Sequence, residues 1–178
     1  MEKIGTHNSA TGERGNGLLS FFGKPFAKCQ SKTIREQYES GCRFFDLRAK
    51  KVNGTWRCAH GFWTTKRTLH DILNEINAFD DVCVVTLTYE GYCDEPYFIE
   101  FKAEVEDIFK KYDGIQFQYF AAKLPKWTIF EKIGKNYPIQ GFKPIVGVRS
   151  LLPIPWLWHK ISKKPTFNDK KFTLVDFL

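Results

Sequence analysis

Residues 82–87, with the sequence VCVVTL, form a nearly continuous apolar run that is rich in β-branched side chains. A run of this kind is typical of a strand that is covered on both faces, as strands are in a parallel sheet. We therefore expect a strand over residues 82–88, in a sheet whose two faces are both covered.

Helical patterns lie on both sides of this strand. In residues 68–79 the apolar side chains recur with the spacing of one helical face, and Thr68 with Asp71 can form a capping box. A second pattern covers residues 94–112, where Asp94 can cap a helix. The alternation of strands and helices predicts an α/β fold.

Six further segments have the length and composition of strands. They are residues 3–6, 43–47, 55–59, 115–119, 144–148 and 172–176. The chain has 178 residues, of which 43% are hydrophobic, so it can form one domain with a substantial core. We expect residues 1–178 to be that single domain, and we expect a monomer.

The net charge of the chain indicates what kind of partner it binds, and its cysteines indicate whether it holds a zinc site. The chain has 27 Lys and Arg against 20 Asp and Glu, a net charge of +7, which favours an anionic partner such as a phospholipid surface. A nucleic-acid partner is disfavoured because the positive charge is dispersed and no recognised binding motif accompanies it. Five cysteines without a C-x-x-C pair or a zinc-like spacing indicate reduced structural thiols.

The sequence also bears on location. No run approaches the roughly 20 apolar residues of a membrane span. The first residues carry no basic segment followed by an apolar one, so we expect no signal peptide in this chain. The expected location is peripheral to a membrane, either cytoplasmic or, if the N-terminus was trimmed, secreted.

Polar residues follow the predicted strands at the points where strands give way to loops. His7 follows the first strand, Asp46 and Arg48 lie at the end of the second, His60 follows the third, and Asp176 ends the last. Active sites of α/β barrels lie at the C-terminal ends of the strands. We therefore expect these five side chains to converge.

These residue types suit the cleavage of a phosphodiester. Two histidines can act as base and acid, and an arginine can neutralise the charge that builds on phosphorus. Asp46 and Arg48 point to the same face because side chains alternate along a strand. The alternative for this pair is a structural ion pair, and a lone histidine is more often structural than catalytic. His70 and His159 are assigned no chemical role.

Five segments carry a resemblance to a known family. They are GTHNSATG (5–12), GCRFFDLRAKK (41–51), CAHGFW (58–63), VCVVTLTYE (82–90) and FTLVDF (172–177). Together they resemble the catalytic domain of phosphatidylinositol-specific phospholipase C, an X-domain-like member of the phospholipase C-like phosphodiesterases. The resemblance implies a compact, distorted or incomplete (β/α)8 TIM-type barrel, because a complete barrel needs at least about 200 residues.

The resemblance implies a mechanism and a role for each residue. His7 would be the general base on the inositol 2-hydroxyl, and His60 the general acid on the leaving oxygen. Arg48 would stabilise the phosphoryl oxygens, Asp46 would position Arg48 and support the acid, and Asp176 would orient His7. The products would be a cyclic phosphodiester and diacylglycerol.

Arg48 also bears on the cofactor. Calcium-dependent animal members of the family carry a carboxylate at this position, whereas the bacterial type carries an arginine. The chain therefore resembles the metal-independent bacterial type, and no cofactor is expected. The alternative is Ca²⁺ bound by Asn8, Asp46 and Glu90, because Asn8 follows the histidine as it does in calcium-dependent members.

Substrate contacts and a membrane-facing rim complete the expected site. Asn8, Thr88 and Tyr119 are candidate substrate-binding residues, and Thr88 stands where the bacterial enzymes carry a lysine. Residues 18–24 and 151–160 are too apolar for ordinary loops, so we expect them to insert into a membrane on the side of the site. Their alternative role is aromatic packing that closes a short barrel. The rim residues are Phe21, Phe22, Trp156 and Trp158.

Two other functions remain open at this point. One is a metal-dependent glycerophosphodiester phosphodiesterase, which shares the barrel and uses histidine-rich motifs. The other is a non-catalytic module that binds a membrane or a phospholipid headgroup and retains the motif.

Overall fold

The computed structural model describes residues 3–90, 95–123, 128–132, 139–141, 170 and 172–175. Several predictions lie outside these ranges, namely the strand over 144–148 and the side chains of Asp176, Trp156 and Trp158. The side chain of Tyr119 is also outside the description, although its backbone is described.

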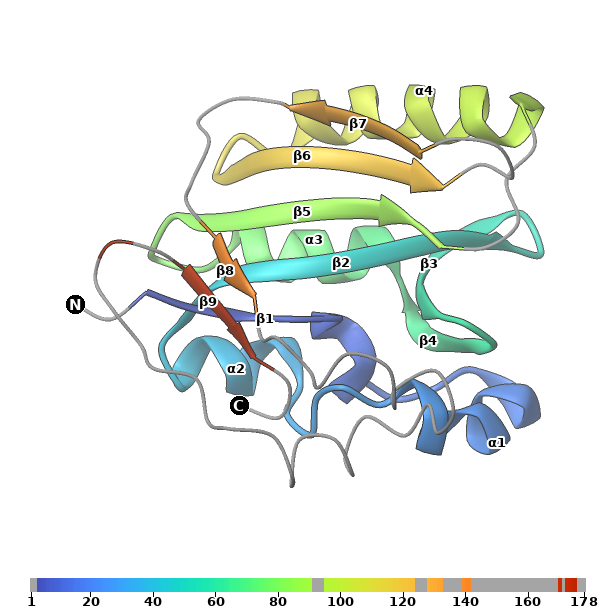
Figure 1. Cartoon of the computed structure of the whole chain (residues 1–178), viewed down its shortest axis with the longest axis horizontal. Coiled ribbons are helices and arrows are strands. Elements are labelled where there is room, and N and C mark those ends of the chain that lie inside the picture. Colours follow the sequence, from blue (N-terminus) through green and yellow to red (C-terminus); the bar gives the residue numbers. More distant parts are fainter. Residues whose placement is uncertain are drawn as a thin grey trace.

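A mainly parallel sheet runs through the molecule (Figure 1). Its strands are β1 (Ile4–Thr6), β2 (Cys42–Val52), β3 (Thr55–His60), β4 (Trp63–Thr68), β5 (Cys83–Tyr89), β6 (Ile115–Lys123), β7 (Thr128–Lys132), β8 (Ile139–Gly141) and β9 (Phe172–Val175). The helices are α1 (Gly17–Ala27), α2 (Ile34–Glu39), α3 (Leu69–Asn77) and α4 (Glu95–Lys111), with a 3₁₀ turn, η1, over Ser9–Gly12.

The strand order confirms the α/β prediction. The sheet runs β7-β6-β5-β2-β1-β9-β8, and every neighbouring pair from β6 to β8 is parallel, whereas β7 is antiparallel to β6. The last strand, β9, lies beside the first, β1. Within the residues that the structure describes, this path is an open sheet with β7 and β8 at its edges.

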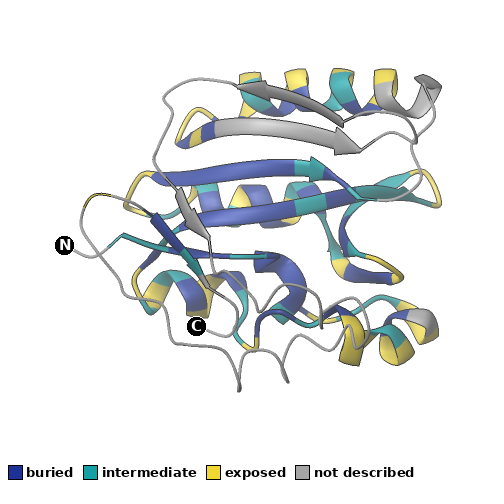
Figure 2. Ribbon diagram, viewed as in Figure 1, coloured by how far each residue is buried: buried dark blue, intermediate teal, exposed yellow. Residues whose placement is uncertain are grey.

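The apolar run at 82–87 forms the middle of the sheet, as its composition predicts. Its residues from Cys83 onward belong to β5, which lies between β2 and β6 and is almost wholly buried, whereas Val82 precedes the strand and is exposed (Figure 2). α3 and α4 follow the two predicted helical patterns, and the capping box of Thr68 and Asp71 is present. Their apolar faces pack with one face of the sheet in the main core, which includes Phe45, Leu47, Ile72, Val85, Leu87 and Val105.

The other face of the sheet changes from apolar to polar along each strand. Phe44 and Val84 pack with Phe172 in a small second cluster. Two residues further on, the same face carries Asp46 on β2 and Thr86 on β5, which are opposite each other in the register. The polar residues therefore lie beyond the apolar cluster, toward the C-terminal ends of the parallel strands.

The predictions for the second and third strands were partly wrong. β2 extends to Val52, well beyond the predicted end at residue 47. β3 returns antiparallel to β2 and pairs with β4, which was not predicted. The turn of this hairpin holds Asn53 and Gly54 with positive φ, a conformation that Asn and Gly tolerate. His60 thus reaches the site on a returning strand.

Another prediction was wrong about local structure. Residues 18–24 were expected to form a loop, but they lie within helix α1, beside β4 (Figure 1). Asn16 and Ser20 join α1 to Thr64 of β4, where the Asn16 amide donates to the Thr64 carbonyl at 2.8 Å and the Ser20 hydroxyl donates to it at 3.1 Å. β7 and β8 were also not predicted.

A close approach of two backbones holds the turn that follows His7. A Cβ atom on Gly12 would lie 1.8 Å from the carbonyl oxygen of Lys32, so glycine is required there. Because the obstacle is backbone, no side-chain rotation can make room.

We expect Gly12→Ala to lower the free energy of unfolding by about 1–3 kcal/mol, the usual cost of overpacking. Urea denaturation followed by tryptophan fluorescence measures this change. The matched control is Gly23→Ala, since a Cβ at Gly23 meets only ordinary contacts and alanine favours a helix. Equal stability of the two variants would contradict the prediction.

Candidate active site

His7 is held at the start of the loop that follows β1. Asn8, the next residue, has a left-handed backbone (φ 48°, ψ 49°), a conformation that asparagine adopts more readily than most residues. Its amide donates to Oδ2 of Asp46 at 3.2 Å, and the side chain of Gln30 donates to the His7 carbonyl at 3.0 Å. The His7 backbone is therefore tied both to β2 and to the segment after α1.

Asp46 is a buried carboxylate that faces several site residues. It accepts hydrogen bonds from the Asn8 amide and from the Thr86 hydroxyl, the latter at 3.2 Å. Its Oδ2 atom also lies 3.9 Å from Nε2 of His7 and 3.9 Å from Nε of Arg48. The predicted shared face of Asp46 and Arg48 is confirmed, because both face His7.

The contact between Arg48 and His7 fixes the protonation of the imidazole. Nη2 of Arg48 lies 3.0 Å from Nε2 of His7. A guanidinium has only donors, so Nε2 must accept and the proton of the neutral ring resides on Nδ1. The side-chain amide of Asn8 lies 3.3 Å from the same nitrogen and is a second donor to it. The lone pair on Nε2 of His7 is therefore engaged by Arg48 and Asn8, and the neutral ring lies beside a fixed cation.

Arg48 is set between two carboxylates. Its Nη1 donates to Oε2 of Glu90 at 3.3 Å, and Asp46 lies on its other side. Burial opposes the charged guanidinium, but the charges of Asp46 and Glu90 outweigh it and raise the pKa of Arg48. The other oxygen of Glu90 accepts from the Gly61 amide at 3.0 Å, which brings the loop after His60 to the same place.

His60 lies on the other side of this group, held by the segment that follows α1. Its Nδ1 donates to the carbonyl of Ala27 at 2.8 Å and lies 4.0 Å from Sγ of Cys29. Because a carbonyl can only accept, Nδ1 carries a proton, and Nε2 is the other ring nitrogen. Burial opposes the charged ring, but Cys29 and the Ala27 carbonyl outweigh it and raise the pKa of His60.

Cys29 links the two histidines, and no pattern in the sequence points to this role. The side-chain amide of Asn8, which contacts His7, also donates to Sγ of Cys29 at 3.3 Å. Three consecutive contacts therefore lead from His7 through Asn8 and Cys29 to His60. A cysteine in a segment without a motif reads as an ordinary buried thiol, so its place could be found only from the fold.

The predicted substrate-binding residues lie at different distances from this group. Asn8 is part of it. Thr88 is half-buried on β5 and pairs in register with Arg48. The backbone of Tyr119 pairs with Thr86 on the neighbouring strand, and its side chain is outside the described residues. Glu90, predicted only as a possible calcium ligand, instead hydrogen-bonds to Arg48 and Gly61.

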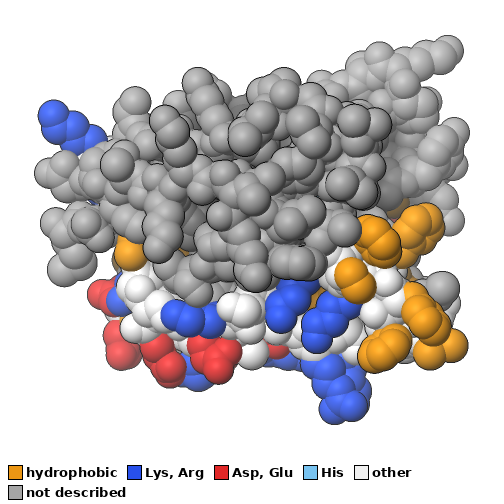
Figure 3. Space-filling view, turned by 60° about the horizontal axis from the view of Figure 1, so that its bottom comes forward, with side chains coloured by type: hydrophobic (Ala, Val, Ile, Leu, Met, Phe, Trp, Pro, Cys, Tyr) orange, Lys and Arg blue, Asp and Glu red, His pale blue; other side chains and the backbone are white. Residues whose placement is uncertain are grey.

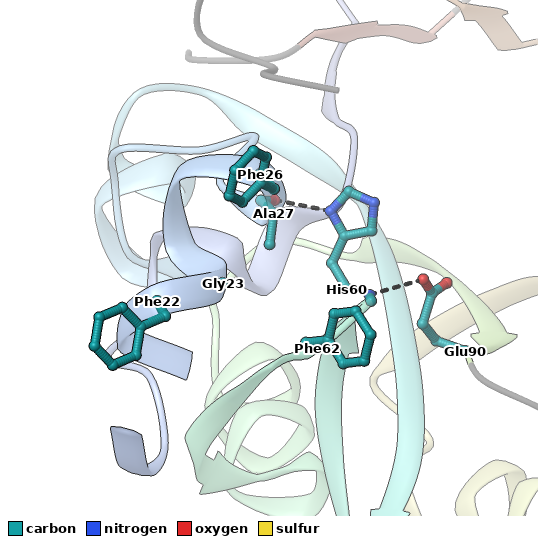
Figure 4. A pocket seen from close by; sticks show the side chains of 8 residues that line it. Phe22, Gly23, Phe26, Ala27, His60, Phe62 and Glu90 are labelled. Carbon is teal, nitrogen blue, oxygen red and sulfur yellow. Dashed lines mark hydrogen bonds between the residues drawn. The ribbon is translucent and has the colours of Figure 1, made fainter. Parts of the chain in front are cut away.

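An apolar pocket of about 530 Å³ opens beside His60 (Figure 4). His60 and Glu90 form its polar side, and its other lining residues are Phe22, Gly23, Phe26, Ala27, Gly61 and Phe62. The pocket therefore joins a candidate proton donor to a surface that suits a hydrocarbon.

The outer face of α1 is apolar and exposed. Leu18, Phe21, Phe22 and Phe26 are 72%, 70%, 65% and 55% exposed, and their spacing places them on neighbouring turns of the helix. Figure 3 shows apolar side chains gathered over this end of the molecule, with Lys and Arg side chains beside them. The helix is attached through polar Ser20, so its phenylalanines are directed to solvent.

The described residues contain no cluster of three or more His, Cys, Asp or Glu side chains placed to bind a metal ion. None of the described helices has the length and hydropathy needed to span a membrane.

The chain shares its fold with bacterial phosphatidylinositol-specific phospholipases C of known structure. No family model and no curated protein matches the sequence. The enzyme from Listeria monocytogenes superposes with a TM-score of 0.59 at 14% identity, over 98% of this chain and 87% of that chain. A mutant of the Staphylococcus aureus enzyme gives 0.57 at 15% identity, over 98% and 84%. The sequence resemblance is thus confirmed at the level of the fold.

We expect His60 to contribute stability that depends on pH. Its pKa is raised in the folded protein, so the contribution is fully present below the unfolded value of about 6.5 and is lost as pH rises through the folded pKa. The free energy of unfolding of the wild type should therefore exceed that of His60→Gln by more at pH 5.5 than at pH 8.5. Parallel stability curves for the two proteins would contradict this.

Proposed function

We propose that this protein cleaves the phosphodiester of a phosphatidylinositol-type phospholipid by intramolecular phosphotransfer. The observation that carries the proposal is the contact between Arg48 and Nε2 of His7, because it sets a basic nitrogen beside a cation suited to phosphate. The fold shared with bacterial phosphatidylinositol-specific phospholipases C supports it. The pairing of β9 with β1 supports a sheet that closes as a distorted (β/α)8 barrel.

The first step is the attack on phosphorus. When the phosphate of the substrate draws the Arg48 guanidinium to its oxygens, the lone pair on Nε2 of His7 becomes available. Nε2 then takes the proton of the inositol 2-hydroxyl, and that oxygen forms a bond to the neighbouring phosphorus. Negative charge gathers on the phosphoryl oxygens, where Arg48 stabilises it. Asp46 keeps Arg48 and the His7 loop in place through its contacts with both.

The second half of the reaction is the departure of diacylglycerol. The bond from phosphorus to the glycerol oxygen breaks, and His60 gives that oxygen a proton from Nε2, since its Nδ1 is held by Ala27. The raised pKa of His60 supports a protonated ring before the reaction. The proton taken by His7 balances the one that His60 gives, and the other product is the cyclic phosphodiester.

The surroundings of His60 support a lipid as the leaving group. The pocket that His60 borders is lined by Phe22, Phe26 and Phe62. Diacylglycerol is apolar, so it buries more hydrocarbon against three phenylalanines than a polar sugar would. The pocket therefore favours a phospholipid over a water-soluble phosphodiester.

The position of Arg48 supports catalysis without a metal ion. Two of the alternative calcium ligands, Asp46 and Glu90, both face the guanidinium. A divalent cation bound between them would be repelled by this fixed positive charge. The proposed reaction therefore assigns charge stabilisation to Arg48.

Helix α1 supports an encounter with a membrane surface. Its exposed face carries four large apolar side chains, and Lys24 lies on the same helix. Aromatic side chains favour the membrane interface, and lysines favour anionic lipid. The pocket beside His60 shares Phe22 and Phe26 with this face, so docking of α1 would bring the candidate site to the lipid.

We expect vesicles of phosphatidylinositol incubated with the protein and EDTA to give the phosphorus NMR signal of a cyclic phosphodiester. His7→Ala and Arg48→Ala should each lower the rate by about 10²–10⁴-fold, because each removes one proton-transfer or charge-stabilising group. The control is His70→Gln, since His70 contacts Tyr112 and Glu104 away from this group and should leave the rate nearly unchanged.

The other outcomes identify the competing functions. Activity that disappears in EDTA and returns with a divalent ion indicates a metal-dependent phosphodiesterase. A slow rate that is the same in the wild type and in His7→Ala indicates a non-catalytic binding module. Either outcome overturns the proposed mechanism.

We expect Phe21→Ser and Phe22→Ser each to weaken binding to anionic vesicles by about tenfold or more, because each removes an aromatic ring from the inserted face. Vesicle sedimentation measures binding, and the melting temperature should change little because both rings are exposed. Val82→Ser is the control, since Val82 is also an exposed apolar residue but precedes β5. A lower melting temperature with unchanged binding would assign these rings to packing.

A further inference from the structure

Cys29 lies inside the candidate active site, and the mechanism described so far does not use it. Its side chain is fully buried. Its backbone amide donates to the hydroxyl of Thr11 at 3.0 Å, which fixes the segment after α1 against the turn that follows His7. The sulfur therefore has a defined place between Asn8 and His60.

The atoms around the sulfur are hydrogen-bond donors. On one side the side-chain amide of Asn8 donates to Sγ at 3.3 Å. On the other side Nδ1 of His60 lies 4.0 Å away, and this nitrogen carries a proton because its other neighbour is the carbonyl of Ala27. The Nδ1 proton is donated to Ala27, so the sulfur accepts from Asn8 and faces the ring edge of His60 as a neighbouring charge would. A thiolate accepts such a hydrogen bond better than a thiol.

The charged side chains around His60 come from β2 and from the end of β5. Arg48 and Lys50 on β2 are positive, and Arg48 lowers the tendency of His60 to be protonated. Glu90, at the end of β5, is engaged by Arg48 and by the Gly61 amide, and Asp46 by Asn8 and Thr86. In the described part of the site, the carboxylates of Glu90 and Asp46 are thus bound to other groups, and Cys29 is the acidic side chain that contacts the ring of His60.

We propose, building on the proposed function, that Cys29 is a positioning residue for the acid His60 and that the two form a thiolate–imidazolium pair. The thiolate keeps the Nδ1 edge of the ring turned toward Ala27, which leaves Nε2 for the leaving oxygen. Its negative charge keeps the ring protonated until that oxygen departs. Nearby cationic groups favour a thiolate.

The proposed pair also explains why residue 8 is an asparagine and not an aspartate. An aspartate at this position would place a second negative charge 3.3 Å from the sulfur and would repel a thiolate. The amide of Asn8 instead donates to Sγ and to Nε2 of His7. The side chain of Asn8 thus stabilises both the unprotonated Nε2 of His7 and the thiolate of Cys29.

The test replaces Cys29 by serine, which keeps a small polar side chain but cannot carry the charge. NMR titration of the His60 ring should show its pKa lowered by about one unit in Cys29→Ser, the usual effect of losing an opposite charge at this range. In the same variant, the pH at which the cleavage rate falls on the alkaline side should be lower by about the same amount. In the wild type, one thiolate should appear in the absorbance near 240 nm at a lower pH than the thiolates of Cys42 and Cys83, and Cys29→Ser should lack it. Burial raises the pKa values of Cys42 and Cys83 to about 11 and about 12.

Cys58→Ser is the matched control, because Cys58 is an equally buried thiol on β3 whose pKa burial raises. It should leave the His60 titration and the pH profile unchanged. A merely structural role of Cys29 would lower the melting temperature without moving the His60 titration, and that result overturns the proposal.

Different experiments would contradict the proposed function and the proposed Cys29–His60 pair. If the protein does not cleave phosphatidylinositol, the NMR titration still decides whether Cys29 and His60 form a charged pair. If it does cleave the lipid and Cys29→Ser keeps the wild-type His60 titration, the reaction stands and the pair is rejected.

Discussion

The buried carboxylate of Asp46 is the constraint on which the rest of the site depends. A carboxylate taken out of water must be satisfied by donors, and here the donors come from the loop after β1 and from β5. The guanidinium of Arg48 adds an opposite charge 3.9 Å away. Asp46 lies on the same sheet face as Phe44, two residues further along β2, and is only 7% exposed. The carboxylate thereby locks the loop of His7 to the strand of Arg48.

The sequence predicts much of this because strands obey a simple alternation. The apolar run of β5, the helical faces of α3 and α4, and the common orientation of Asp46 and Arg48 all follow from the spacing of side chains along one segment. His7 follows a strand that the sequence also identifies. Each of these predictions needs only local information and the general rule that parallel strands end on the same side.

The parts that could not be predicted depend on contacts between distant segments. His60 arrives on an antiparallel return of the β2–β3 hairpin, and its partner Ala27 ends a helix that was expected to be a loop. The helix forms although it contains Gly23 and Pro25, because Asn16 and Ser20 attach it to β4. Cys29 belongs to the same class, since only the fold sets it between Asn8 and His60.

The pairing of β1 with β9 has a consequence for how the molecule is made. β1 comprises residues 4–6 and β9 residues 172–175, so the strand that leads to His7 gains its second neighbour only after the intervening residues 7–171 have been synthesised. Contacts between such distant segments form slowly and leave strand edges unpaired in the meantime. A nascent chain would therefore carry an unpaired β1 edge until β9 has been synthesised, and a chain cut before β9 would keep that edge open to pairing with another strand.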